Sequence, residues 1–183
     1  YIEMLHEAIA EISGQEIPEV NDTQAELPIN AFIPATWIVN REEKLDAYKS
    51  ATDCSDEKDL AELATDWTNR YGIIPKPVES LIMLMRLKLL AKKCGFYLIK
   101  LRKPNIVIET KIKKPTFEIF KNALPSSVQN KFNFEEQELV SKIIIRGLGV
   151  TEIQNQIDQL MLWFGSFVKE INSFDKELHL KRE

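Results

Sequence analysis

Few side chains in this 183-residue sequence are suited to nucleophilic or acid–base chemistry. A serine, cysteine or threonine nucleophile needs a positioned base, which is usually histidine. The chain has only two histidines, His6 and His179, one near each end and each in a segment expected to form an exposed helix. Neighbouring carboxylates such as Glu135 and Glu136 point in different directions and form no acid–base pair. We therefore expect no catalytic residue, and a stand-alone hydrolase is the weakest interpretation.

Nucleotide and metal sites are equally absent from the sequence pattern. No GxxxxGK[ST] loop is present, and the pair Gly147 and Gly149 is typical of a strand-to-helix turn. The two cysteines, Cys54 and Cys94, are 40 positions apart and belong to no CxxC or HxxxH pattern. We interpret both as ordinary buried or surface thiols, and we predict no cofactor, metal ion or disulfide framework in this chain.

The remaining candidate site is a row of acidic and amide side chains on one predicted helix. Asp59, Glu62, Asp66 and Asn69 follow a 3-4-3 spacing, which places them on one face, opposite an apolar stripe. One interpretation is a solvated helix face without a specific role. The other is a docking surface for an arginine-rich partner, because Arg–carboxylate pairs are strong and geometrically specific.

Charge is unevenly distributed along the chain, although the net charge is only −4. Residues 1–72 carry 16 acidic and 5 basic side chains, whereas residues 73–183 carry 12 acidic and 19 basic ones. Residues 86–121 hold eleven basic side chains, with Glu109 and Glu118 as the only acids. Two interpretations stay open: a nucleic-acid-binding accessory domain that uses this basic region, or solvated faces of helices and strands. The aromatic residues of a single-strand-binding platform are not interleaved here.

The elements that position these residues follow from the spacing of apolar side chains. Helical spacing predicts helices at 1–13, 40–52, 55–71, 77–94, 115–123 and 151–171, and strands are predicted at 26–34, 96–101, 105–112 and 139–146. Asn40 and Ser55 are the expected N-caps, and Leu45 and Tyr48 the inward side chains of the second helix. The prediction is an α+β fold, with a small, mainly antiparallel sheet packed with about six helices.

Three segments in order resemble one bacterial family. They are ELPINAFIP at residues 26–34, NRYGIIPKPVESL at 69–81 and RLKLLAKKCG at 86–95. They are similar to the L-P-V-x-A-x-I-P strand, the D-R-F-G-x-x-P-x-P-V turn and the R-L-K-x-x-A-K-x-x-G-I helix end of the C-terminal (TRCF) domain of transcription-repair coupling factors (Mfd). The resemblance covers residues 1–172 and is sharpest over 26–95.

The resemblance implies a parent protein that is an ATP-driven translocase of double-stranded DNA, a helicase-like hydrolase of the cytoplasm. Such a parent displaces stalled RNA polymerase and recruits the excision-repair protein UvrA. ATP and Mg would bind to a motor upstream of this chain. The family's C-terminal domain is non-catalytic and autoinhibitory: it packs on an N-terminal UvrB-like module and masks the UvrA-binding surface.

The resemblance also implies domain boundaries and site residues. Residues 1–25 would be a helix and linker leaving the motor, residues 26–172 the regulatory domain, and residues 173–183 a frayed tail. Because the chain starts at Tyr1 inside a predicted helix, we expect it to be a fragment. The family's two acidic residues that pair with arginines of the N-terminal module fall on Asp66 and Asn69. Because Asn69 can accept a hydrogen bond but cannot form an ion pair, either the attachment is weaker or its role shifts to Glu62, one turn earlier. We expect no membrane partner, because the longest apolar stretch, residues 80–91, is too short to span a bilayer.

Overall fold

The computed structural model describes residues 16–180 of the chain, with side chains described through residue 177. The chain divides into two compact units. The helical unit consists of Pro28–Leu89, and the sheet unit consists of the segment through Leu27 together with the segment from Leu90 onward. The helix predicted at residues 1–13 lies outside the described residues.

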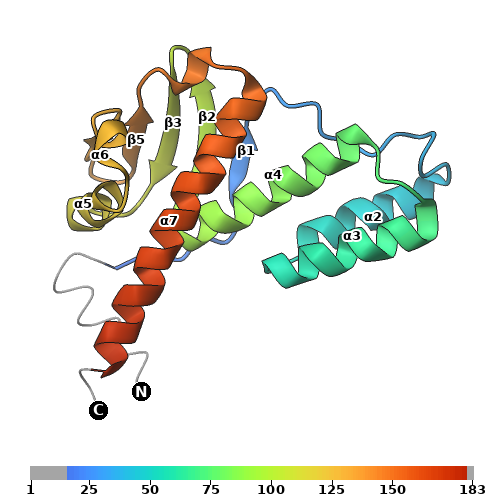
Figure 1. Ribbon diagram of the computed structural model, residues 1–183, viewed down its shortest axis with the longest axis horizontal. Coiled ribbons are helices and arrows are strands. Elements are labelled where there is room, and N and C mark those ends of the chain that lie inside the picture. The colour runs from blue at the N-terminus through green and yellow to red at the C-terminus, as the bar shows by residue number, and fades with distance from the viewer. Residues whose placement is uncertain (1–15, 181–183) are drawn as a thin grey trace. The chain divides into compact units, whose positions relative to one another are not determined.

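A five-stranded sheet forms the centre of the sheet unit (Figure 1). Its strands lie in the order β1-β2-β3-β5-β4. Strand β1 pairs with β2 in parallel, and the other three pairings are antiparallel. The strands are β1 (Gln24–Glu26), β2 (Phe96–Arg102), β3 (Asn105–Thr110), β4 (Phe132–Glu135) and β5 (Ser141–Ile145).

The described residues also form six α-helices and one short 3-10 helix, Leu148–Val150. The α-helices are α2 (Arg41–Asp53), α3 (Glu57–Tyr71), α4 (Lys76–Lys93), α5 (Lys114–Asn122), α6 (Ser126–Gln129) and α7 (Ile153–Leu180). The predicted α+β fold, with a mainly antiparallel sheet and about six helices, is confirmed.

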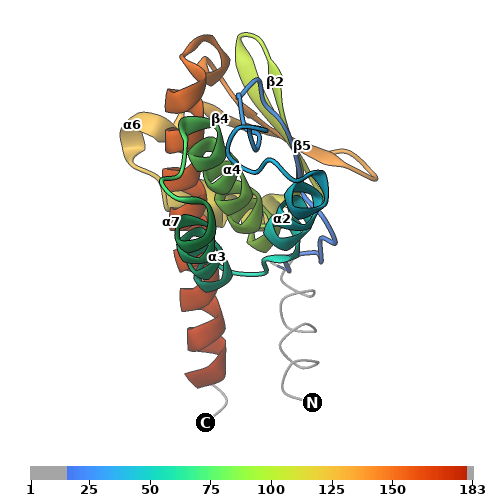
Figure 2. The ribbon, with the colours of Figure 1, turned by 90° about the vertical axis from the view of Figure 1, so that its right-hand side faces the viewer.

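The core of the sheet unit lies between one face of the sheet and α7, which runs along that face (Figures 1 and 2). Strand registers place Ile99, Ile108 and Ile143 in one row across the sheet, and all three are buried. Helix α7 contributes buried Phe164 and Phe167, both of which make ring contacts with Phe96 of β2. Burial of such apolar and aromatic surface is the main stabilising term for this unit.

The helical unit is organised around Trp67 of α3, which is only 2% exposed. Its indole ring meets the ring of Trp37 edge-on, with centroids 6.0 Å apart. Helix α2 contributes buried Ala47 and Ala51 to the same cluster, and α4 contributes buried residues that include Val78. The N-cap predicted at Asn40 is confirmed, because its side chain accepts a hydrogen bond from the Glu43 N–H. Leu45, predicted to point inward, is 57% exposed, so that prediction was wrong.

The strand predicted at residues 26–34 was wrong, although its alternation of burial is real. Strand β1 ends at Glu26, and residues 27–34 pair with no strand. Buried or half-buried side chains alternate with exposed ones from residue 27 to residue 33. The main chain bonds elsewhere: the Ile33 N–H donates to the Tyr48 hydroxyl, and the Phe32 N–H donates to the Pro77 carbonyl. Alternating burial therefore reflects an extended segment packed among helices, not a member of the sheet.

One strand and one helix boundary also differ from the prediction. Strand β4 was missed, because its four residues are too few for a clear alternation; pairing with β5 and stacking of Phe134 on Phe117 stabilise it. Helix α7 continues to Leu180, nine residues beyond its predicted end at Ile171. That extension follows the absence of any glycine or proline between residues 166 and 180.

Candidate regulatory interface

Helix α3 carries the candidate residues, and its ends are set by local hydrogen bonds. Asp56 is the N-cap, since its side chain accepts a hydrogen bond from the Asp59 N–H at 2.8 Å. Ser55, the predicted cap, instead donates to the Asp59 carboxylate from both its N–H and its hydroxyl, at 3.0 and 2.9 Å. The helix ends at Gly72, whose φ of 90° is a conformation that favours glycine.

The apolar stripe predicted on α3 faces inward and so determines which face remains outside. Leu60 and Trp67 are buried, and Leu63, Ala64 and Tyr71 are partly buried. At the end of the helix the Tyr71 hydroxyl donates a 3.4 Å hydrogen bond to Glu43 at the start of α2. Because the helix is anchored along this side, its opposite side presents a defined row of polar side chains.

Glu62, Asp66 and Asn69 are all exposed on that opposite side. We call these three residues the α3 acidic face. Asp59, the fourth member of the predicted row, differs because it is half-buried and holds Ser55 at the start of the helix. The hydrogen bonds from Ser55 hold the pKa of the Asp59 carboxyl below its usual value. Asp59 therefore has a local capping role, which leaves three residues of the row for a partner.

Asp66 has one neighbour of opposite charge within its own helix. A guanidinium nitrogen of Arg70 lies 3.5 Å from a carboxylate oxygen of Asp66, and the guanidinium carbon lies 5.5 Å from the Tyr71 ring centroid. Arg70 was not among the predicted site residues. The signal that could have revealed it is spacing, because Asp66 and Arg70 are four positions apart on a helix.

Two exposed aliphatic side chains near the ends of α2 and α3 were also not predicted as surface features. Val39 precedes the N-cap of α2 and is 83% exposed, and Ile73 follows the end of α3 and is 91% exposed. The hydrogen bond between Tyr71 and Glu43 joins these two helix ends. Apolar and acidic groups are thus both available on the helical unit, a combination found in protein–protein interfaces.

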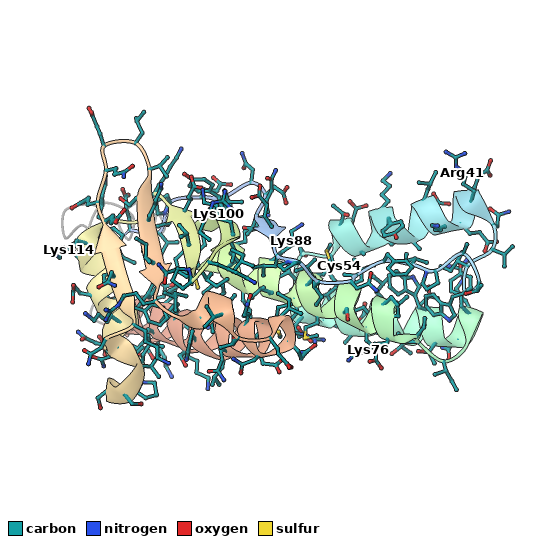
Figure 3. The ribbon with its side chains drawn as sticks, turned by 90° about the horizontal axis from the view of Figure 1, so that it is seen from above. Arg41, Cys54, Lys76, Lys88, Lys100 and Lys114 are labelled. Carbon is teal, nitrogen blue, oxygen red and sulfur yellow. The ribbon has the colours of Figure 1, made fainter. Side chains whose placement is uncertain are left out.

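Two basic side chains of the region 86–121 are already paired with acidic ones. Arg86 is already paired, since its Nε lies 2.8 and 2.7 Å from the two carboxylate oxygens of Glu57. Lys100 lies on β2 (Figure 3), and its ammonium is 2.8 Å from a carboxylate oxygen of Glu109 on β3. Both side chains of that second pair are less than one-fifth exposed. Arg86 and Lys100 therefore each have an acidic partner within the chain.

The described part of the chain contains no group of side chains that could hold a metal ion, and its cysteines form no disulfide. Within residues 16–177, no three His, Cys, Asp or Glu side chains are grouped so that they could hold a metal ion. Cys54 and Cys94 are both free thiols. His6 and the side chain of His179 lie outside the described part of the chain. Among the described helices, none has the length and apolar character required to cross a membrane.

Comparison with known proteins gives one consistent family. The model of the TRCF domain matches residues 27–120, just over half of the chain. The transcription-repair-coupling factor of Staphylococcus haemolyticus (strain JCSC1435) is 28% identical over an alignment of 145 residues, which covers 76% of this chain. The transcription-repair-coupling factor of Bacillus subtilis (strain 168) is 33% identical over 101 residues, which are 55% of this chain. This chain spans about a tenth of the length of these curated relatives, 12% and 9% respectively.

A solved structure agrees in fold. The crystal structure of the C-terminal domain of transcription-repair coupling factor matches with a TM-score of 0.70 and 19% sequence identity. The match covers 86% of this chain and 99% of the solved one. The chain thus belongs to the TRCF domain family and has the fold of the C-terminal domain of transcription-repair coupling factors.

Proposed function

We propose that this chain is the non-catalytic regulatory domain of a transcription-repair coupling factor and that it docks on the N-terminal UvrB-like module of its own parent. Membership in the TRCF domain family supports a role in transcription-coupled DNA repair. The parent would be a cytoplasmic, ATP-driven translocase of double-stranded DNA, with ATP and Mg held by an upstream motor. Its other partners would be stalled RNA polymerase and UvrA.

The observation that supports docking is the exposure of the α3 acidic face on a well-anchored helix. Arginine side chains of a partner can reach the carboxylates of Glu62 and Asp66, and the Asn69 amide can contribute a hydrogen bond. Because α3 is held by the burial of Leu60 and Trp67, these three groups are presented with little loss of conformational freedom on binding.

Docking would also explain how the domain restrains its parent. A domain seated on the UvrB-like module would cover the surface that binds UvrA, so repair proteins could engage only after release. The proposed attachment is polar, with one ion pair fewer than the family pattern because Asn69 replaces an aspartate. Polar attachments of this kind are reversible and sensitive to salt.

The direct test measures binding of this chain to the separately produced N-terminal module by calorimetry. We expect Asp66→Arg to weaken binding by about 2–5 kcal/mol if the pair is desolvated in the complex, and by less than about 1 kcal/mol if it stays exposed. Asp46→Arg, on the exposed part of α2, changes the charge equally and serves as the matched control. Equal affinities of the wild type and Asp66→Arg would refute the role given to this face.

A gain-of-function variant makes the test independent of any loss of folding. Asn69→Asp restores the acid of the family pattern and adds an exposed carboxylate to the α3 acidic face. We expect affinity for the N-terminal module to rise several-fold, and the rise to shrink as salt is increased. A fall in affinity would contradict an arginine at the facing position of the partner.

A further inference from the structure

A second charged surface lies in the sheet unit and uses none of the residues of the α3 acidic face. It consists of five lysines that are all exposed: Lys92, Lys93, Lys111, Lys113 and Lys114. We call them the lysine surface. Lys92 and Lys93 end α4, Lys111 follows β3, and Lys113 and Lys114 begin α5 (Figure 3 labels Lys114). They are five of the eleven basic residues in the region from 86 to 121.

Direct contacts bring the two lysine-bearing segments together. The Thr110 hydroxyl donates a 2.7 Å hydrogen bond to the Gly95 carbonyl. A Cβ atom at Gly95 would lie only 3.1 Å from Cγ2 of Ile112. The end of α4 therefore lies beside the chain that leaves β3, and two lysines from the first segment join three from the second.

These lysines are not held in ion pairs within the described part of the chain, although the acidic segment 16–22 packs beside them, with the Glu16 carbonyl accepting a 3.5 Å hydrogen bond from Thr116 of α5. None of the five forms an ion pair with an acidic side chain of residues 16–177, in contrast to Lys100 and Arg86. Two acids, Glu19 and Asp22, line a groove together with Lys111 and border the surface on one side.

The charge pattern of α5 is unfavourable for the isolated chain. The first turn of a helix normally carries acidic residues, because the N-terminal end of the helix dipole is positive. Helix α5 has no acid in its first turn and no side-chain cap, and it begins with Lys113 and Lys114. Positive side chains at a positive helix end are mildly unfavourable, and an anionic partner would offset this cost.

We propose that the lysine surface binds the phosphate backbone of duplex nucleic acid. Clustered lysines act as point charges that neutralise successive phosphates and read no sequence. Phe96 of β2 and Phe117 and Phe120 of α5 are buried and cannot stack on unpaired bases. Tyr97, which lines the groove with Lys111, is half-buried, and a single ring is not a row of stacking platforms. The surface therefore suits a duplex, whose closely spaced phosphates need no stacking. In the parent protein the lysine surface of the sheet unit would contact DNA, and the α3 acidic face would stay available for the N-terminal module.

The test titrates the full chain into a fluorescein-labelled 20-base-pair DNA duplex of arbitrary sequence and follows fluorescence anisotropy. With about four to five phosphates neutralised, log Kobs should fall with log salt at a slope of about −4. Raising salt from about 50 to 200 mM should then weaken binding about 100-fold or more. Absence of binding at about 20 mM salt, or a slope near zero, would overturn the proposal.

Matched variants locate the contact. Lys111→Glu with Lys113→Glu should weaken binding about tenfold or more and make the salt slope shallower by about two. The control, Lys103→Glu with Lys169→Glu, changes net charge equally at exposed positions on the β2–β3 turn and on α7. Equal losses in the two double variants would show attraction to overall charge only and would overturn the assignment of this surface. Circular dichroism confirms that both variants are folded.

Discussion

Asp66 and Arg70 form an ion pair within α3, with a guanidinium nitrogen 3.5 Å from a carboxylate oxygen. The Arg70 side chain is 59% exposed and that of Asp66 is 54% exposed, so water and salt screen the pair. Such a pair contributes less than about 0.5 kcal/mol to the stability of a helix. Asp66 can therefore exchange Arg70 for an arginine of a partner at little energetic cost.

Removing Arg70 should consequently strengthen docking. Arg70→Ala frees the Asp66 carboxylate and removes a positive charge that would repel an arginine-rich partner. We expect about a twofold to threefold gain in affinity for the N-terminal module, measured by calorimetry at low salt. Lys58→Ala removes the same charge from the other end of α3 and is the control. Weaker binding of Arg70→Ala would mean that Arg70 itself contacts the partner.

The hydroxyl of Tyr48 should be important for the stability of the helical unit. It accepts a 2.8 Å hydrogen bond from the main-chain N–H of Ile33, which is fully buried. Tyr48→Phe leaves that N–H without an acceptor, which costs about 1–3 kcal/mol of unfolding free energy. Urea unfolding followed by tryptophan fluorescence measures the effect, with Trp37 and Trp67 reporting on the helical unit and Trp163 on the sheet unit. Tyr71→Phe loses only an exposed 3.4 Å hydrogen bond to Glu43 and should change stability by less than about 0.5 kcal/mol.

Two glycines of the sheet unit should respond to alanine in opposite ways. A Cβ at Gly149 would lie 2.7 Å from the Asn105 carbonyl oxygen and 2.9 Å from that of Pro104, both main-chain atoms that cannot move aside. Gly149→Ala should destabilise the protein by about 1–3 kcal/mol. Gly165 lies within α7, and a Cβ there would meet no neighbouring element within 4 Å, so Gly165→Ala should stabilise by up to about 1 kcal/mol. Thermal unfolding midpoints that fall in both variants would contradict this.

Cys94 should make stability depend on alkaline pH. Burial raises the pKa of the Cys94 thiol well above the ordinary value of 9.0. The native state therefore keeps its proton at a pH where the unfolded state loses it, so the unfolding free energy is highest below about pH 9 and falls as pH rises further. The slope should approach about 1.4 kcal/mol per pH unit.

Denaturant unfolding between pH 8 and 10 measures that slope, and Cys94→Ala should reduce it.

Cys54 is the internal comparison for thiol reactivity, since its side chain is only partly buried. Burial and the nearby carboxylate of Asp59 also raise the pKa of Cys54. In native protein a thiol-alkylating reagent should still modify Cys54 first and reach Cys94 only after unfolding. Equal alkylation rates would contradict the burial of Cys94.

Local sequence signals were sufficient where an element is stabilised by its own residues. The apolar spacing of α3 and the side-chain cap at Asn40 both act over a few positions, and each was predicted. The position of Asp66 on the exposed face of α3 follows from the same periodicity, because a helix that buries Trp67 must turn its opposite side outward.

Tertiary structure alone decided which charges remain available and which extended segments become strands. No local pattern indicates that Arg86 pairs with Glu57, that Lys100 pairs with Glu109, or that the end of α4 lies beside the chain that leaves β3, because these contacts join residues far apart in the chain. Residues 27–34 have a strand-like alternation yet bond to Tyr48 and Pro77. Alternating apolar and polar residues indicate only that one side of a segment is buried. Whether the segment becomes a strand depends on whether the fold places another strand beside it.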